Sequence, residues 1–357
     1  MRMIGRSPCV CAFTLAAVAA LARPAGAQQR LDVVLGVVRS GGAKIPYAVV
    51  QFGGGMRFSD DSGAFRITNV PPGSYRLYVR QVGFRPFDTT VVKTAGSALD
   101  VPVTMEPLVI ELAAITVEVP RSCTAPGPPD STVSPQMAAI FDQLRQNAER
   151  FALLADSYPF HFRMSRVFAD YDARGAVVYT ATDTLRRLSS GRVHYRPGRV
   201  VAFVLGPDRS IQKGILLPTL ADFADSAFQA NHCFYYAGTV ESDSGRLVRF
   251  DYVPADSLRF PDIEGEVDLD ARSFQIRTAT IRLTRVARAM PGLTSSTSTL
   301  RFAELYPNIV VPVRMEGQEI PEPRLDVKTP VARETETQQL LDVHFERALP
   351  ASRPRGP

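Results

Sequence analysis

The chain has 357 residues, with 41 basic and 36 acidic side chains and a formal charge of +5. That length is sufficient for two ordinary domains behind a leader segment. The charge is too small and too evenly spread to create a strong field for nucleic acid or anionic lipid, so we expect no nucleic-acid partner.

The first 27 residues have the three parts of a secretory signal peptide. Arg2 and Arg6 precede an uncharged apolar run over residues 9–22, and Ala25-Gly26-Ala27 forms a small-residue cleavage site. Cleavage leaves 330 residues with a formal charge of +2 and no further segment of transmembrane length. We therefore expect an exported protein that is periplasmic, extracellular or at the cell surface.

Two other interpretations of this leader remain. It is an uncleaved membrane anchor if the cleavage site is not used, although its apolar run is shorter than the ~20 residues of a bilayer span. A lipoprotein anchor is less consistent with the sequence, because Cys9 and Cys11 stand at the start of the apolar run and not after it.

Two cysteines, Cys123 and Cys233, follow the leader. An exported protein is in an oxidising compartment, where a pair of cysteines favours a disulfide. The bridge would close a loop of about 110 residues, which the chain-entropy model values at about 4–5 kcal/mol. The alternative is two buried free thiols, because sequence does not show that the sulfurs meet.

Residues 28–119 are predicted to form a β-sandwich of about seven strands. Short segments of alternating apolar and polar residues are separated by turn residues, with no helical period. In one connection, Pro71 and Pro72 fix an extended entry into a strand over 74–82, and Gly73 is able to supply a positive φ. The predicted strands are 31–37, 47–52, 56–59, 64–68, 74–82, 87–93, 99–105 and 109–119.

Several motifs in this region occur in a characteristic order: a G-V-V start at Gly36, D-S-G-A-F at Asp61, V-P-P-G-S-Y at Val70 and a closing V-G-F at Val82. This order resembles the carboxypeptidase regulatory-like domain, a transthyretin-like seven-strand sandwich grouped with carbohydrate-binding-like folds. The resemblance implies a module for packing, adhesion or binding and not a catalyst.

Three residues of the predicted strand over 74–82 are candidate ligand-binding residues. Arg76, Tyr78 and Arg80 share one face, where an aromatic ring between two guanidinium groups can stack on a sugar or hold an anion. The alternative is a solvated outer face, because arginine stems cover apolar surface well in any strand.

Residues 120–133 are rich in Pro, Ser and Thr and read as a linker. A second domain is expected over residues 134–320. It opens with a helix of about 20 residues capped by Ser134 with Pro135 at its first position, and long antiparallel strands follow, with a short helix near 218–230. This order predicts an α+β domain with a curved, half-barrel-like sheet, so the fold class is mainly β.

Residues 321–357 turn polar and proline-rich, and we expect a C-terminal tail with at most an edge strand over 339–345.

Residues 232–276 resemble the uncharacterised C-terminal half of exported bacterial proteins that carry the same N-terminal domain. A looser resemblance, resting on strand order, is to the half-barrel of outer-membrane lipoprotein carriers. That resemblance implies an apolar concave face able to hold an acyl chain. The alternative is a sheet whose concave face is filled by its own helix.

No catalytic constellation is visible in the sequence. The four histidines, His161, His194, His232 and His344, lie in no zinc-peptidase spacing, and no nucleophile or phosphate-loop motif occurs. His232 beside Cys233 is either a metal pair or Cys-His dyad, or two structural residues. Alternating acids, at Asp262, Glu264, Glu266, Asp268 and Asp270, suggest a calcium site, a glycosidase pair or, more simply, the wet face of a strand.

We therefore expect no enzyme activity, no metal and no cofactor. The leading hypothesis is a non-catalytic exported binding or structural module of the cell envelope, with an envelope protein or a glycan as partner. The alternatives are a periplasmic carrier of lipid or lipoprotein and, less well supported, a hydrolase with an unrecognised site at His232. The sequence does not identify the ligand or the oligomeric state.

Overall fold

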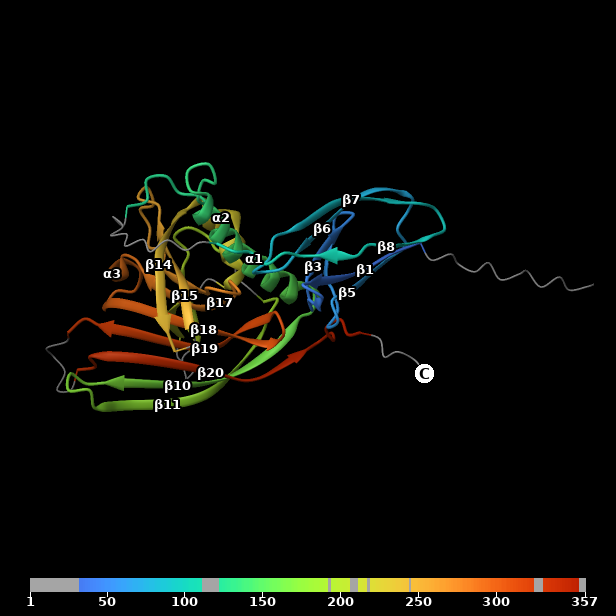
Figure 1. Ribbon diagram of the computed structural model, residues 1–357. Helices are drawn as coiled ribbons and strands as arrows, with labels where there is room; N and C mark the ends of the chain where they lie inside the picture. Colours follow the sequence, from blue (N-terminus) through green and yellow to red (C-terminus); the bar gives the residue numbers. More distant parts are fainter. Residues whose placement is uncertain are drawn as a thin grey trace, which may run out of the picture.

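The computed structural model describes residues 32–110, 122–191, 194–205, 211–216, 219–243, 245–323 and 330–352. It is mainly β, as predicted, with an N-terminal sandwich and a curved antiparallel sheet joined by one long helix (Figure 1). The predicted signal peptide, residues 1–27, lies outside the described residues. Among the described residues, no helix has both the length and the apolar content required to cross a bilayer.

The N-terminal sandwich consists of two small sheets packed around one apolar core. One sheet has the order β4-β3-β6-β7; in the other, β1 pairs with β5 and β2 and, in parallel, with β8 and β9. The core contains Val34, Val50 and Leu77, all fully buried. The strands are β1 (Val33–Ser40), β2 (Ala43–Lys44), β3 (Val49–Phe52), β4 (Gly55–Phe58), β5 (Ala64–Thr68), β6 (Gly73–Arg80), β7 (Phe87–Lys93), β8 (Ala98–Asp100) and β9 (Val103–Thr104).

Two local details of the sandwich differ from the sequence prediction. The positive φ before β6 belongs to Asn69 (58°) and not to Gly73, which is already part of the strand. Residues 109–110 are not in a strand, and Leu108 and Ile110 pack against the core of the second half. The rest of the predicted strand over 109–119 lies outside the described residues.

The second half opens with the predicted helix, α1 (Pro135–Ser157), which has Pro135 in its first turn. Ser134 occupies the N-cap position but makes no side-chain capping bond. The short helix expected near 218–230 is two short helices, η1 (Leu220–Ala224) and α2 (Ser226–Ala230). Asp225 caps α2 by accepting bonds from the backbone N–H groups of Ala227 and Phe228.

One nine-stranded sheet, with the order β11-β10-β20-β19-β18-β17-β16-β15-β14, forms the body of this half, and β12 and β13 form a separate hairpin. Every neighbouring pair in the large sheet is antiparallel. The elements are β10 (Phe160–Tyr171), β11 (Val177–Leu188), β12 (Val201–Leu205), β13 (Ile211–Ile215), β14 (His232–Ser242), β15 (Gly245–Pro254), β16 (Ile263–Asp270), β17 (Ile276–Leu283), α3 (Val286–Ala289), β18 (Leu293–Tyr306), β19 (Ile309–Pro321) and β20 (Arg333–Phe345).

The C-terminal segment corrects the prediction of a polar tail with an edge strand. Strand β20 lies inside the sheet, between β10 and β19, and pairs along most of its length with β10. The polar composition of β20 misleads because polar residues are usually exposed, whereas most residues of this strand are half-buried. Beyond it, the chain returns to the sandwich, where Pro350 O accepts a bond from Asp61 N and Ser352 N donates to the Asp61 carboxylate.

The concave side of the sheet is filled by helices over β14–β18. Side chains of α1, η1 and α2, including Phe141, Leu144, Phe223 and Phe228, form one core with residues from these strands. Of the two arrangements expected from the sequence, the structure therefore has the one in which the protein's own helix fills the concave face. Beyond β18, α1 also packs on the sheet near the sandwich, where Leu154, Phe160 and Val311 belong to a second apolar cluster. Farther along these strands the sheet is polar, at Ser296, Ser298 and Glu319.

Candidate functional site

The three candidate residues on β6 are brought together, but they do not form an open site. The guanidinium carbons of Arg76 and Arg80 lie 5.0 and 5.5 Å from the ring centroid of Tyr78. Arg76 is exposed and binds Asp88 of β7, with Nε 2.8 Å from Oδ1. Arg80 is nearly buried and pairs with Glu149 of α1. The Tyr78 ring is thus already in contact with two cations of the chain itself, and only the Arg76 end of the row faces solvent.

Arg80 belongs to a polar junction between the sandwich and the second half. Its partner Glu149 also binds Arg145, which in turn binds Asp142, so a chain of charges runs along α1. These groups are partly exposed, which limits the stabilisation that each pair supplies. They mark the rim of the junction.

Arg150 is at the centre of this junction. It is buried, with its side chain projecting from α1 between the two halves of the molecule. Nη1 donates to Tyr47 O at 2.9 Å and to Gln81 Oε1 at 2.8 Å, and Nη2 donates to Asn308 O at 2.6 Å. Its guanidinium carbon is 5.3 Å from the ring centroid of Phe58. One cation thus links the sandwich, α1 and the β18–β19 turn.

Burial lowers the pKa of Arg150 to about 9, and the nearby carboxylate of Glu304 opposes that decrease. The side chain therefore remains cationic at neutral pH and needs all its acceptors, because an unsatisfied buried cation is costly. A cavity of about 20 Å³ adjoins Arg150 and is lined in part by Gln81 and Asn147. Gln81 Nε2 has no protein partner there, and the space is sufficient for about one water molecule.

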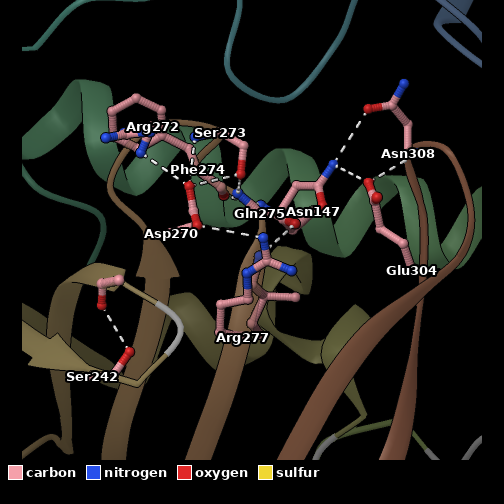
Figure 2. Close-up of polar contacts among 12 residues, drawn as sticks. Asn147, Ser242, Asp270, Arg272, Ser273, Phe274, Gln275, Arg277, Glu304 and Asn308 are labelled. Carbon is pink, nitrogen blue, oxygen red and sulfur yellow. Dashed lines mark hydrogen bonds and ion pairs between the residues drawn. The ribbon is translucent and has the colours of Figure 1, made fainter.

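A tight turn between β16 and β17 completes the junction (Figure 2). Asp270 accepts bonds from the backbone N–H groups of Arg272 and Ser273 and holds the turn. Asn147 of α1 donates to Phe274 O and accepts from Ile276 N, at 2.9 and 3.1 Å. Gln275 reaches across to Glu304, with Nε2 2.6 Å from Oε1. The helix is therefore fixed to the sheet through backbone groups as well as by apolar packing.

The closing V-G-F motif of the sandwich meets this turn. Gly83 has a φ of 84°, and a Cβ at that position would lie 2.7 Å from Ser273 O. Its N–H donates to Gln143 Oε1 at 2.8 Å. Only glycine combines this backbone conformation with such a close approach, so the end of the sandwich motif also serves as a contact with the second half.

His232 does not form a site with Cys233. The two residues are consecutive on β14, so their side chains point to opposite faces of the sheet. The His232 side chain is fully buried, with Nδ1 2.9 Å from Phe228 O and Nε2 3.1 Å from Ile263 O. Asp262 Oδ1 lies 3.7 Å from Nε2, and its other oxygen accepts a bond from Tyr195 OH at 2.7 Å.

Two effects oppose each other at this buried pair. Burial lowers the pKa of His232 and raises that of Asp262, which disfavours the charges. The bonding favours them, because carbonyl oxygens face both ring nitrogens, and only the doubly protonated ring donates to both. Asp262 accepts from Tyr195 OH and Ile263 N, as a carboxylate does. We give more weight to the bonding pattern and expect an imidazolium–carboxylate pair.

Cys123 and Cys233 form a disulfide, with their Cα atoms 5.5 Å apart. The bridge fixes the segment that precedes α1 against the β14 edge of the sheet. Gly127 N donates to His232 O, Tyr235 OH donates to Ser122 O, and Asp256 N donates to Cys123 O. This segment covers part of the backbone edge that β14 would otherwise present to solvent.

The other residues considered as catalytic or metal-binding groups lie in separate places. His161 is 2.9 Å from Glu346, His194 is 3.8 Å from Asp225, and His344 is exposed on β20. The acids predicted as a calcium site or a wet strand face have separate partners: Asp268 binds Arg249, Glu266 binds Arg282 and Asp270 holds its own turn. In the part of the chain that the structure describes, no group of three or more His, Cys, Asp or Glu side chains is placed to hold a metal ion.

The opposite edge of the sheet is open. Among the described residues, β11 pairs with β10 and with no other strand, and it is the outermost strand in Figure 1. Val177, Val178 and Tyr179 are 57%, 43% and 45% exposed. Because consecutive residues point to opposite faces, both faces of β11 are uncovered at this end. The sequence did not identify β11 as an edge strand, because an edge strand and an interior strand with a polar face show the same alternation of apolar and polar residues.

The fold and these contacts define a disulfide-linked, mainly β protein in which a small sandwich is docked onto a helix-filled curved sheet. Residues 33–106 match the family model of the carboxypeptidase regulatory-like domain. The chain thus carries a carboxypeptidase regulatory-like domain, as the sequence motifs predict. A search of curated proteins found no match.

Solved structures give only distant similarities. A DUF1329 family protein from Desulfovibrio piger is 9% identical with a TM-score of 0.32, over 58% of this chain and 94% of its own. A putative outer membrane lipoprotein-sorting protein domain from Vibrio parahaemolyticus is 11% identical with a TM-score of 0.30, over the same shares. A cohesin–X-dockerin complex from Acetivibrio cellulolyticus is 13% identical with a TM-score of 0.19, over 24% of this chain; the match spans 61% of that chain.

Proposed function

We propose that this protein is a non-catalytic binding module of the cell envelope that docks a protein partner along β11. The observation that carries the proposal is the 12-residue open edge, with Val177, Val178 and Tyr179 exposed at one end. An open strand edge presents backbone donors and acceptors in a row, and an extended polypeptide is the partner that matches them. The alternating side chains of β11 would select among such partners.

The other edge and the rigid junction support this assignment. At β14, the disulfide-linked segment occupies part of the edge, so the two ends of the sheet differ in accessibility. The Arg150 junction joins the sandwich to the sheet through buried contacts. A rigid two-part scaffold holds its edge in one orientation, which lowers the entropy cost of binding.

Location in the envelope is part of the proposal. It rests on the signal-like leader over residues 1–27, which lies outside the described residues, and on the disulfide, which is typical of oxidising compartments. Fractionation of cells that make the protein naturally, with mass analysis of its N-terminus, tests it. A cytoplasmic chain that retains residue 1 would contradict it.

A glycan site on β6 is the less favoured form of the same function. A sugar stacks best on an open aromatic face, whereas Tyr78 already contacts Arg76 and Arg80. Carriage of lipid is also less favoured, because helices fill the concave face over β14–β18 and α1 covers Phe160 and Val311 nearer to β10. Analysis of organic extracts of the purified protein tests this alternative, and a stoichiometric lipid would support it over ours.

Site-specific photo-crosslinking tests docking on β11. A photoreactive residue at Val178 should capture one defined protein partner in the native cells, and the same residue at Val133, which is 82% exposed before α1, should not. Ala181→Pro and Thr182→Pro sharpen the test, because neighbouring N–H groups of a strand point to opposite sides. In one of the two variants, the N–H group that is lost points away from β10, so the pairing with β10 stays intact. That variant should lose the adduct.

Two results would contradict the proposal. Equal adducts at Val178 and Val133 would show non-specific capture and not edge docking. Hydrolase turnover by the purified protein that is lost in His232→Gln would place it among enzymes.

A further inference from the structure

Three loops at one end of the large sheet bring exposed arginines together around an exposed phenylalanine. The turn 196–199 precedes β12, the loop 255–262 connects β15 to β16, and the segment 284–289 leads from β17 through α3. Phe260 in the second loop is 53% exposed. The exposed arginines of these loops are Arg196, Arg199, Arg259, Arg285 and Arg288.

Specific contacts hold these loops against one another. Gly198 has a φ of 73°, and a Cβ there would lie 2.8 Å from the Phe260 Cβ, so the first turn rests directly on the second loop. Arg285 Nη1 donates to Phe260 O at 2.8 Å, and Arg288 Nη1 donates to Arg259 O at 2.6 Å. The exposed phenylalanine is therefore fixed by its own backbone and is not a loose side chain of a mobile loop.

The backbone of Arg285 is itself unusual. Its φ of 49° and ψ of 46° place a non-glycine residue in the left-handed region, which costs free energy unless the surroundings hold it. The bond from its side chain to Phe260 O is one such contact. Strain of this kind is concentrated at functional segments, and here it orients a guanidinium group beside the exposed ring.

The charge of this surface is unbalanced among the described residues. Arg285 and Arg288 donate there to backbone carbonyl oxygens, and the Arg288 guanidinium carbon also lies 5.8 Å from the Phe260 ring centroid. Against the five arginines, the exposed acid of the same three loops is Asp256. Each guanidinium group has five N–H donors, so most donors of the five arginines face solvent. An open hollow of about 500 Å³ adjoins α3, and Glu322 is the acid in its lining.

Apolar side chains accompany the charges. Val286 and Leu293 line the hollow with Arg285 and Arg288. Phe203 is 74% exposed on β12, the strand that leaves the 196–199 turn. Guanidinium groups around an exposed phenylalanine are a combination suited to anionic membranes, where the cations meet lipid phosphates and the ring enters the acyl boundary. A soluble anion would match the cations alone.

We propose that this surface docks onto a lipid surface rich in anionic phospholipid. The charge is evenly spread along the sequence, but the fold gathers five exposed arginines on three adjacent loops. The small net charge of the whole chain does not oppose docking, because the attraction acts within about a Debye length, roughly 8–10 Å, of the clustered arginines. The surface is formed around β15–β18, whereas the proposed protein-binding edge is β11 at the far side of the strand order. A membrane-docked molecule would therefore keep its β11 edge accessible.

Vesicle flotation tests the proposal with the full chain, comparing vesicles of phosphatidylglycerol and phosphatidylcholine with vesicles of phosphatidylcholine alone. We expect binding to the anionic vesicles that weakens as salt increases. Arg199→Gln with Arg259→Gln should weaken it by about 25-fold, at about fivefold for each arginine. The double variant leaves the Arg285 and Arg288 bonds to the loop in place. Arg174→Gln with Arg186→Gln, an equal charge change on β11 and its turn, is the matched control.

Three results would overturn the proposal. Equal binding to both kinds of vesicle would mean that charge has no role and that another apolar segment, such as residues 9–22, is responsible. Equal losses in the test and control variants would mean that position has no role. Binding to dextran sulfate that matches or exceeds binding to anionic vesicles would assign the arginines to a soluble polyanion.

Discussion

Arg150 of α1 donates a hydrogen bond to the carbonyl oxygen of Tyr47, a residue 103 positions earlier in the chain. The same guanidinium group binds Asn308 O, 158 positions later. Neither acceptor is a side chain, so the contact depends on the backbone path of both partners and not on their residue types. This buried cation thereby couples the sandwich to the curved sheet, beside an apolar cluster in which Phe58 of the sandwich packs with Leu154 of α1 and Ile309 of β19.

Arg150→Met should therefore destabilise the protein by about 3–5 kcal/mol, because it removes the donor from two buried acceptors, Tyr47 O and Gln81 Oε1, and from the partly buried Asn308 O. Urea unfolding followed by fluorescence measures the change. Arg145→Met on the same helix is the matched control and should cost less than about 1 kcal/mol, since its pairs are partly exposed. Equal losses in the two variants would mean that Arg150 does not couple the two halves.

The two arginines on β6 should separate structural from binding roles. Arg80→Ala removes a nearly buried partner of Glu149 and should cost about 2–3 kcal/mol, whereas Arg76→Ala, on an exposed pair, should cost under about 1 kcal/mol. Thermal unfolding of both variants measures this. If Arg76→Ala instead abolishes binding to a glycan array without loss of stability, the β6 face is a ligand site after all.

The disulfide should stabilise the β14 edge most. Cys123→Ser with Cys233→Ser opens a cross-link between residues 110 positions apart and should cost about 2–4 kcal/mol. Hydrogen exchange should accelerate in β14 and in residues 122–127, and should change little in β11, which the segment does not touch. Uniform acceleration across the sheet would mean that the bridge acts on global stability alone.

The sandwich could be predicted from the sequence because its signals are local. Alternation, turn residues and the V-P-P-G-S-Y and V-G-F motifs each depend on a few neighbouring residues. The junction could not, because Arg150 finds its partners over separations of 69 to 158 residues. The expected edge strand over 339–345 is part of β20, but its interior position was missed for a related reason, since nothing local shows that a polar strand lies between two others.

For the candidate site residues too, the sequence predicts local relationships and not long-range contacts. The sequence suggested that Arg76, Tyr78 and Arg80 share a face, because strand alternation is short-range. It did not show that Arg80 faces α1. His232 was a chemical candidate only through its neighbour Cys233. The carboxylate beside its ring, Asp262, is 30 positions away, and the ring that contacts it, Tyr195, is 37 positions away.

His232 should carry protons on both ring nitrogens at pH 7. Two bound protons satisfy the carbonyl oxygens of Phe228 and Ile263, and the carboxylate of Asp262 balances the charge. Nitrogen-15 NMR of the ring distinguishes an imidazolium from either neutral tautomer. Asp262→Asn should lower the pKa of His232 and destabilise the fold by about 3 kcal/mol or more. A single protonated nitrogen in the parent protein would instead support a neutral pair.

Glu319 should make the sheet less stable as the pH rises. Glu319 lies directly opposite Glu334 of the neighbouring strand β20, and Glu334 lies directly opposite Asp170 of β10. Burial raises the pKa of Glu319 to about 7. The nearby carboxylates of Glu334 and Glu336 add to this rise, and a hydrogen bond from Ser296 opposes it. The folded state therefore binds a proton more tightly than the unfolded state does, and its stability falls as pH rises from about 4.5 through 7.

Replacing Glu319 by Gln removes that proton dependence. We expect Glu319→Gln to stabilise the protein at pH 8 by on the order of 1–2 kcal/mol, discounted for partial exposure, and to change it little at pH 4.5. Urea midpoints at the two pH values measure the difference. Glu316→Gln, on the same strand but paired with Arg314, is the control and should show no gain at pH 8. A gain of equal size at both pH values would mean that side-chain packing, and not ionisation, limits stability at Glu319.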